Sequence, residues 1–142
     1  MKIIVCIDKN NGMMFNNRRQ SQDKILIDDI IKVTKDKKLY MNEYSYSLYK
    51  DEKCKNIVVC DDFLDKCSYD DFCLVENLTL ATYKNKIDTI IIYNWNKDYP
   101  SDFKFDINIK DNNWTLIKSE NLKGNSHDKI TKNIYRRNNN EK

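Results

Sequence analysis

The 142-residue chain is predicted to form a three-layer α/β domain, with a mostly parallel central sheet, helices on both faces and antiparallel C-terminal edge strands. Residues 3–7 form a continuous apolar run and residues 89–93 contain three consecutive isoleucines, and both patterns are typical of parallel strands buried on both faces. Between them, short apolar runs alternate with helical segments. From 103 to 109, apolar and polar residues alternate strictly, which favours an antiparallel edge strand. We expect residues 1–137 to form a single domain, because chains of this length usually fold around one core.

The first predicted strand leads into residues 9–22, a polar stretch rich in asparagine that we interpret as a long loop. Ser21 is a candidate N-cap for the next segment, in which apolar residues recur at helical spacing, and this helix should end near Lys35. The remaining elements of the first 93 residues are short. They are strands at 39–41, 57–60 and 72–75, a helical turn at 44–49 and a short helix at 78–83.

The C-terminal part contains two further segments of regular structure. A strand is predicted to begin at Trp114 and to extend to residue 117. Residues 129–137 fit either a strand or a helix capped by Ser126, because Ile130 and Ile134 lie four positions apart, and we favour the strand. Residues 138–142 are charged and rich in asparagine, so we expect a disordered tail.

Glycine scarcity restricts the possible functions. The chain has only two glycines, Gly12 and Gly124, so neither G-x-G-x-x-G nor G-x-x-x-x-G-K-[ST] occurs. Loops that cradle phosphates need close-set glycines, since only a residue without Cβ lets backbone amides close around an anion. The large dinucleotide-binding and P-loop classes are therefore not expected. The net charge of +3 comes from intermixed charges and does not identify a partner.

Cysteine usage and hydropathy bear on the compartment. The five cysteines include no C-x-x-C pair, and their odd number would leave one unpaired, so we interpret them as reduced thiols of a cytoplasmic protein. Their spacings of six or seven allow a zinc site only through tertiary proximity, and we predict no metal. Only five apolar residues separate Lys2 from Asp8, so no signal peptide is predicted. No membrane span is predicted either, because no apolar run approaches about 18 residues.

Several positions carry a family resemblance. An apolar strand is followed by Gly12 and then by Asp23 at a helix start, while Trp114 opens a late strand and an aromatic residue precedes Arg136. Across residues 3–137, these features resemble the dihydrofolate reductase fold. The family's V-M-G-R-x-T-[WY] segment stands in register with Tyr40-Met41-Asn42-Glu43-Tyr44-Ser45-Tyr46. The resemblance implies that Asp23 is the counterpart of the catalytic acid, and it makes Tyr44 and Ser45 candidate ligand-binding residues.

The chain also departs from the pattern of that family. The Gly-Gly turn that follows the family's fifth strand, where the cofactor pyrophosphate binds, is replaced here by residues 93–98, which include Trp95. The Gly-Arg pair becomes Asn42-Glu43, so an anion replaces a cation. The Pro-Trp pair of the family's substrate loop is replaced here by residues 18–21, Arg-Arg-Gln-Ser. We therefore expect neither a pyridine-nucleotide cofactor bound in the family's manner nor folate.

The chain is also similar to a group of short, uncharacterised bacterial proteins that sometimes carry the label ribonuclease Z. Metal-dependent nucleases of that class share H-x-H-x-D-H, which supplies several imidazoles to two zinc ions. This chain has one histidine, so the residue count excludes that chemistry.

The most concentrated group of polar candidates is Arg18-Arg19-Gln20-Ser21 together with Asp23, between a buried strand and a helix N-terminus. Ligands of open α/β sheets bind beyond the carboxyl ends of strands, where helix amides and cations can meet an anion. Two guanidiniums there favour a phosphate or a carboxylate. The alternative is a capped helix with solvated arginines, in which Asp23 only stabilises the helix start.

Further candidates lie later in the chain. His127 is the residue best suited to general acid or base catalysis, although its place in a polar turn favours a surface histidine. Lys129 and Arg136 could add phosphate contacts or could simply be solvated. Trp95, with Tyr93 and Tyr99, could stack on a base or fill the space of the missing glycine turn.

Three functions follow as hypotheses. The first is a reductase-like domain that has lost the cofactor site and binds a small anionic ligand, such as a nucleotide, at the 18–23 loop. The second is an RNA-binding or metal-independent ribonuclease function that uses Arg18, Arg19, His127, Lys129 and Arg136. The third is a protein interaction module with a surface of Tyr44, Tyr46 and Tyr49. The sequence does not indicate an oligomeric state.

Overall fold

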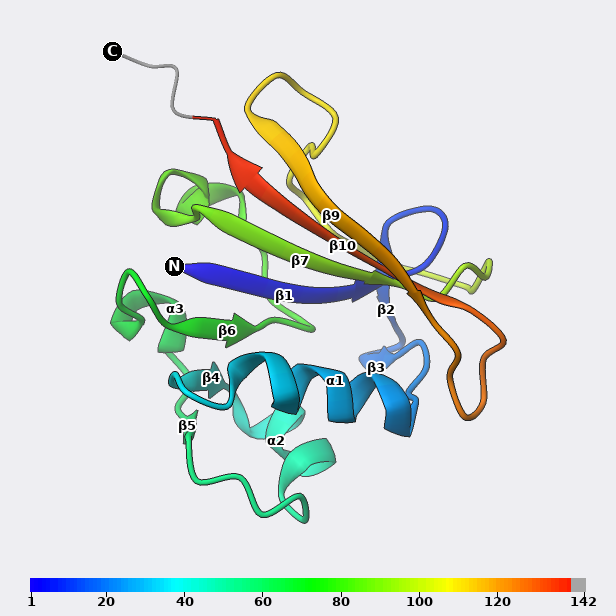
Figure 1. The fold of residues 1–142 in the computed structure, drawn as a ribbon, viewed down its shortest axis with the longest axis horizontal. Coiled ribbons are helices and arrows are strands. Elements are labelled where there is room, and N and C mark those ends of the chain that lie inside the picture. The colour runs from blue at the N-terminus through cyan, green and yellow to red at the C-terminus, as the bar shows by residue number, and fades with distance from the viewer. Residues whose placement is uncertain (139–142) are drawn as a thin grey trace.

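The computed structural model describes residues 1–138 and has a seven-stranded sheet at its centre (Figure 1). The strands lie in the order β5-β4-β6-β1-β7-β10-β9. Their bounds are β1 Lys2–Ile7, β4 Leu39–Met41, β5 Ile57–Val59, β6 Phe72–Leu74, β7 Thr89–Asn94, β9 Trp114–Leu122 and β10 Ile130–Arg137. The five strands from β5 to β7 pair in parallel, while β10 and β9 run antiparallel at one edge. The predicted mostly parallel sheet with antiparallel C-terminal strands is confirmed.

The two central strands, β1 and β7, are buried on both faces. Ile3 and Val5 of β1 belong to one apolar cluster, and Ile4 belongs to the other, so successive side chains enter opposite sides of the sheet. Ile90 and Ile91 of β7 divide in the same way. This burial explains why both strands are uninterrupted apolar runs in the sequence.

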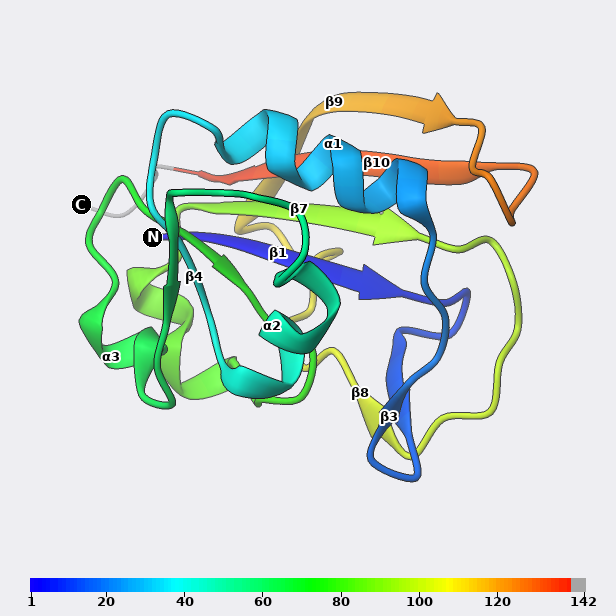
Figure 2. The same ribbon diagram turned by 90° about the horizontal axis from the view of Figure 1, so that it is seen from below.

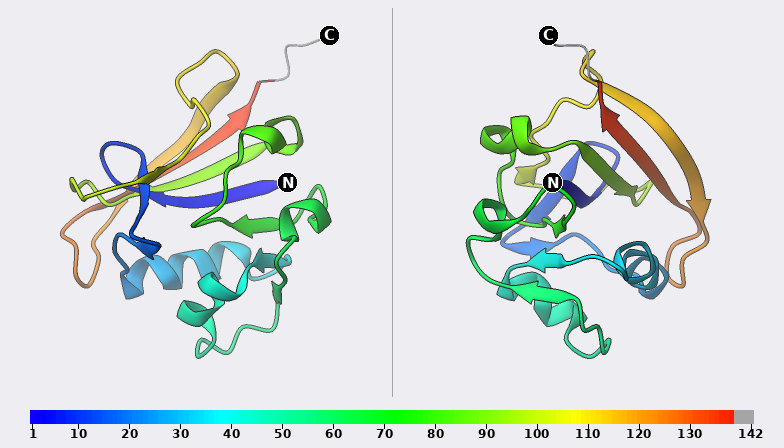
Figure 3. Two further views of the ribbon diagram at one scale, coloured as in Figure 1. Left: turned by 180° about the vertical axis from the view of Figure 1, so that it is seen from behind. Right: turned by 60° about the vertical axis from the view of Figure 1, so that its left-hand side comes forward.

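Helices cover the two faces, as Figure 2 shows for α1 and α3 on opposite sides of the sheet. The helices are α1 Lys24–Thr34, α2 Glu43–Tyr49, α3 Phe63–Lys66 and the 3₁₀ helix η1 Ala81–Lys86. Ile30 of α1 and Tyr49 of α2 pack into the cluster that contains Ile4. Phe63 of α3 packs into the other cluster, and the left view of Figure 3 shows this second layer from behind. The three-layer prediction is therefore confirmed.

A small second sheet lies at the carboxyl end of β1 and corrects the prediction of an irregular loop at 9–22. It consists of β2 Gly12–Phe15, β3 Arg18–Arg19 and β8 Phe103–Lys104, all paired antiparallel. Asn16 and Asn17 form a two-residue hairpin turn with φ values of 52° and 61°. A type I′ hairpin needs positive φ at both central residues, and asparagine tolerates it, so this dipeptide was the missed signal.

The alternating segment after Pro100 is also different from the prediction. Only β8 pairs, and it pairs with β2 in the small sheet instead of extending an edge of the large one. Phe105 and Ile107 are nevertheless buried in the cluster that contains Ile3. The alternation therefore predicted correctly which side chains are buried, but not how the backbone pairs.

Several boundaries were wrong or shifted. Asp23, not Ser21, is the N-cap of α1, and its Oδ1 accepts a hydrogen bond from the Ile25 N–H at 3.0 Å. The helix expected at 78–83 is η1, at Ala81–Lys86, and α3 was not predicted. Residues 129–137 do form a strand, β10.

The first residue of the predicted disordered tail, Asn138, makes two hydrogen bonds to the loop before β9. The Asn138 N–H donates to the Asn113 carbonyl at 2.7 Å, and its side chain donates to the Asn112 carbonyl at 2.7 Å. Residues 139–142 lie outside the described part of the chain. Within that part, no helix has the length and hydropathy needed to cross a membrane.

Candidate functional site

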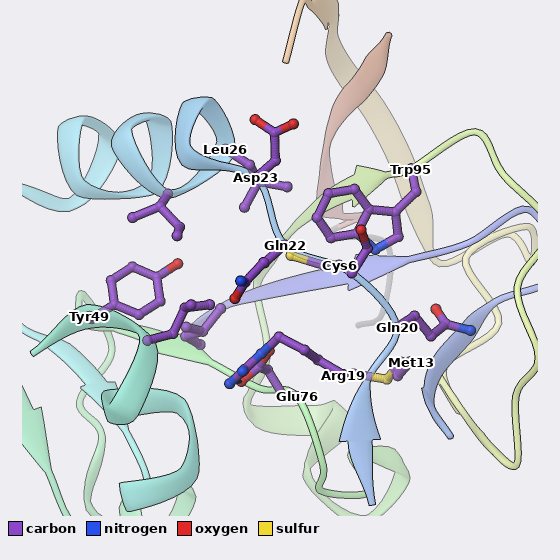
Figure 4. Close-up of a pocket in the computed structure, with 14 residues that line it drawn as sticks. Cys6, Met13, Arg19, Gln20, Gln22, Asp23, Leu26, Tyr49, Glu76 and Trp95 are labelled. Atoms are coloured by element: carbon purple, nitrogen blue, oxygen red, sulfur yellow. Dashed lines mark hydrogen bonds and ion pairs between the residues drawn. The ribbon is translucent and has the colours of Figure 1, made fainter. Parts of the chain in front are cut away.

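A pocket lies where the carboxyl ends of β1 and β6 meet the start of α1 (Figure 4). Its walls are mostly apolar, and its polar residues come from the 19–23 segment and from the residue two positions after β6. The lining residues are Cys6, Met13, Arg19, Gln20, Ser21, Gln22, Asp23, Leu26, Ile27, Leu48, Tyr49, Leu74, Glu76 and Trp95. The space between these walls is about 420 Å³.

Arg19 is held by a carboxylate at the side of this pocket. Its Nε donates to Glu76 Oε2 at 2.8 Å, and a terminal nitrogen donates to Oε1 at 3.0 Å. The guanidinium lies over the ring of Tyr44 at 4.6 Å, and Ser45 Oγ donates to Glu76 Oε1 at 2.9 Å. Burial opposes the charge of Arg19, but its pKa is raised because Glu76 stabilises the cation more strongly. Arg19 is therefore neutralised and is not the free cation that the sequence suggested.

Asp23 is buried, and its carboxylate turns away from the pocket (Figure 4). Besides capping α1, it accepts hydrogen bonds from the backbone N–H groups of Asn125 and Ser126 at 3.1 and 3.0 Å. The Ser126 hydroxyl also donates to it at 3.1 Å, and His127 Nδ1 lies 2.8 Å away. Burial alone would raise the pKa of Asp23, but these hydrogen bonds outweigh it and hold the pKa well below its ordinary value.

His127 is not a surface residue, since only 7% of it is exposed. Its Nδ1 faces Asp23, and its Nε2 lies 2.9 Å from Ser21 Oγ and 3.2 Å from the Tyr99 hydroxyl. The indole of Trp95 stacks on the imidazole, with ring centroids 4.6 Å apart and an angle of 30° between the planes. Trp95 is thus buried and does stack, but on a protein side chain.

This chain of side chains has a defined chemistry. When the imidazole is neutral, a carboxylate beside Nδ1 selects the tautomer that carries its proton on Nδ1. Nε2 of His127 then carries a lone pair and can accept a proton from Ser21 or Tyr99.

An open groove adjoins the pocket and shares Arg19 and Gln20 with it. The space in the groove is about 740 Å³, and its lining is Phe15, Asn16, Arg18, Arg19, Gln20, Tyr99 and Pro100. Arg18 is exposed and has no acidic partner within residues 1–138. The Gln20 amide donates to Asp8 Oδ2 at 3.0 Å and to the Pro100 carbonyl at 3.2 Å. Its Oε1 is buried and, among the described residues, accepts no hydrogen bond.

The structure brings several of the predicted residues together. Ser21, Asp23, His127 and Trp95 form one connected group, and Arg18, Arg19 and Gln20 line the groove beside it. Ser45 is fully buried behind Glu76, and the Tyr44 hydroxyl accepts from the Arg19 N–H at 2.7 Å.

Other predicted residues do not join this group. Lys129 is exposed just before β10, where its carbonyl accepts from Asn96 at 3.1 Å. Arg136 pairs opposite Thr89, at the amino end of β7 and therefore at the other end of the sheet. The five basic candidates consequently do not form one surface. The predicted tyrosine surface is also wrong, because Tyr49 is buried.

Two acidic residues at the site, Asp8 and Glu76, were not predicted from the sequence. Both come just after buried strands, β1 and β6, and the first polar residue beyond such a strand lies at the ligand-binding edge of an α/β sheet. That position was the available signal. No group of three or more potential metal-ligating side chains is found within residues 1–138.

Comparison with known proteins supports the fold. No family model and no curated protein matches the chain. Among solved structures, it matches the dihydrofolate reductase from Enterococcus faecalis complexed with NADP(H) and RAB-propyl, with a TM-score of 0.69 and 10% sequence identity. The match covers 97% of this chain and 96% of that one. The chain therefore has a dihydrofolate reductase-like fold, as its sequence predicted.

Proposed function

We propose that this chain binds a small anionic ligand, such as a nucleotide, in the groove beside the 18–23 loop. The observation that carries the proposal is that two polar groups there have no partner of their own. The exposed guanidinium of Arg18 has no acidic partner among the described residues, and the buried Oε1 of Gln20 has no donor. A ligand that combines a phosphate with an N–H or O–H donor satisfies both groups.

The groove also offers apolar surface for a ring. Phe15 is 41% exposed, and Tyr99 lines the same space. A base stacked on an aromatic side chain gains about 1–3 kcal/mol. A nucleotide therefore matches the groove in three respects, which are charge, hydrogen bonding and stacking.

We further propose that the reductase cofactor site is absent. The strands on both sides of β1 lead into residues with side chains, Val75-Glu76-Asn77 after β6 and Trp95-Asn96 after β7. These segments bring Trp95 and Glu76 to the wall of the pocket, whereas a diphosphate needs close-set backbone amides that glycines allow. The start of α2 is already capped, because the Asn42 side chain accepts from the Ser45 N–H at 3.0 Å.

Calorimetric titration with nucleoside monophosphates, nucleoside diphosphates and NADPH tests both parts of this proposal. We expect a nucleoside phosphate to bind more tightly than NADPH, and Arg18→Gln to weaken its binding about tenfold through loss of one charged contact. Arg136→Gln is the matched control, because this exposed arginine lies at the other end of the sheet. Tighter binding of NADPH, or equal effects of the two substitutions, would contradict the proposal.

A further inference from the structure

Three side chains at the pocket that adjoins the groove form a continuous hydrogen-bonded chain. Ser21 Oγ lies 2.9 Å from His127 Nε2, and His127 Nδ1 lies 2.8 Å from Asp23 Oδ2. A hydroxyl, an imidazole and a carboxylate in this order are the parts of an activated serine nucleophile, whatever the fold that carries them. We infer that Ser21, His127 and Asp23 constitute a nucleophile, a general base and a positioning carboxylate that hydrolyse a small carboxylic ester.

The base is held in the orientation that this chemistry requires. Asp23 already accepts from three backbone N–H groups and one hydroxyl, so its position is fixed. The Trp95 indole stacks on the imidazole and restrains the tilt of the ring. The Nδ1 proton then points at the carboxylate, which leaves the lone pair of His127 Nε2 for the Ser21 hydroxyl.

The nucleophile is accessible. Ser21 is half-buried and lines the pocket, and its neighbour Gln20 lines both the pocket and the groove. If these residues had only a structural role, which is to hold the loop before β10 against α1, Asp23 and the Nδ1 side of His127 would be sufficient. The Nε2 side faces two hydroxyl groups next to the open groove, which such a role does not require.

Tyr99 supplies the second hydroxyl, 3.2 Å from the same Nε2. Because Ser21 takes the lone pair of Nε2, the Tyr99 O–H can turn toward the groove that this residue lines. A tyrosine hydroxyl can donate to the oxygen that gains negative charge when an ester carbonyl is attacked.

The reaction then balances with water as the only co-reactant. Ser21 Oγ bonds to the ester carbonyl carbon while its proton passes to His127 Nε2, and the tetrahedral intermediate expels the alcohol, which takes that proton. Water attacks the acyl-serine and gives a proton to Nε2. The acid leaves as Ser21 Oγ recovers its proton, so one ester and one water yield one acid and one alcohol.

Covalent capture with a fluorophosphonate tests the nucleophile directly. Attack by Ser21 forms an oxygen–phosphorus bond and releases fluoride, which adds one phosphonyl group to the mass of the protein. We expect a single adduct that peptide mapping places on Ser21, no adduct on Ser21→Ala, and an unchanged adduct on Ser119→Ala, a control at an exposed serine of β9. Absence of the adduct from the folded wild-type chain would overturn the inference, and that result does not depend on any variant folding.

Turnover of p-nitrophenyl acetate tests the base. We expect a burst of one p-nitrophenol per chain, and His127→Gln should lower the rate by about 10²–10³-fold, as for loss of a general base. Equal turnover by wild-type and Ser21→Ala protein would overturn the inference.

The esterase inference rests on the proposed function only for the place where the ester binds. The experiments therefore distinguish failure of the inference from failure of the proposed function. If Ser21→Ala binds a nucleotide but the fluorophosphonate does not label the wild type, only the esterase inference is rejected. If the fluorophosphonate labels the wild type but no nucleotide binds, only the nucleotide proposal is rejected.

Discussion

His127 Nδ1 lies 2.8 Å from Asp23 Oδ2, although 104 positions separate the two residues in the sequence. The contact joins the first turn of α1 to the loop that precedes β10, and both side chains are buried. Asn125 and Ser126 donate to the same carboxylate from that loop. One aspartate thus holds the amino-terminal helix, the C-terminal hairpin and the candidate base in their relative positions.

The first prediction concerns stability. Asp23→Asn keeps a cap oxygen for Ile25 but removes the charge that receives His127 and the loop N–H groups. Leaving buried hydrogen-bond donors without their acceptor costs about 1–3 kcal/mol, so the free energy of unfolding should fall by at least that amount in urea denaturation. Asp28→Asn is the control, since Asp28 is exposed and pairs only with Lys24 at 2.8 Å, and it should change stability little. A similar, small loss in both variants would show that the Asp23 network contributes little.

The second prediction is the pH dependence of that contribution. The pKa of Asp23 in the folded chain lies well below its ordinary value of 3.8, so the unfolded chain binds the proton more readily. The stabilisation is therefore complete above about pH 5 and is lost as the pH falls below about 4 toward the folded pKa. Urea denaturation of the wild type and of Asp23→Asn between pH 6 and 2 should show the difference between them shrinking below about pH 4. A difference that does not vary over this range contradicts the assignment.

A third prediction follows from Gly124, which packs against the same carboxylate. A Cβ at this position would collide with Asp23 Oδ2 and would lie 2.9 Å from the His127 carbonyl oxygen. The Asp23 oxygen is held by its hydrogen bonds from Ser126. The His127 carbonyl is held by the Gly124 N–H, which donates to it at 2.9 Å. Gly124→Ala should therefore destabilise the chain by about 1–3 kcal/mol, the usual cost of overpacking, as measured by urea denaturation. A loss below about 0.5 kcal/mol would mean that the loop can shift without penalty.

The glycines also show what sequence reasoning could and could not find. Neither Gly12 nor Gly124 has a positive φ, whereas Asn11, Asn16, Asn17 and Asn96 do. Among residues 1–138, asparagine therefore takes four of the five left-handed positions and Lys53 takes the fifth, while glycine lies where a side chain has no room. Scarce glycine argued against glycine-rich phosphate loops, but it did not exclude a tight hairpin, because asparagine forms the turn at residues 16–17.

The buried strands were predictable because burial on both faces leaves a local signal, as in the runs of β1 and β7. The candidate site was less predictable from the sequence. The 18–23 segment was recognised as polar and next to a helix start, but the burial of His127 depends on Asp23 and Trp95, which are remote in sequence. Likewise, Arg19 looked like a free cation because its partner, Glu76, is 57 positions away. Pairings of this kind have no local pattern, so they appear only when the chain folds.

The last prediction concerns this Arg19–Glu76 pair and the proposed ligand. Because two hydrogen bonds tie the guanidinium to Glu76, an anion in the groove meets a neutral pair at Arg19 and only Arg18 as a free cation. Glu76→Gln removes the negative charge and releases Arg19, so the affinity for a nucleoside monophosphate at low salt should rise about three- to tenfold by calorimetry. Glu52→Gln is the matched control, since Glu52 pairs with Lys24 at 2.7 Å and does not line the groove, and it should leave affinity unchanged. Weaker binding by Glu76→Gln would show instead that the ligand needs the intact pair, either because Glu76 contacts it or because the pair positions the 18–21 segment.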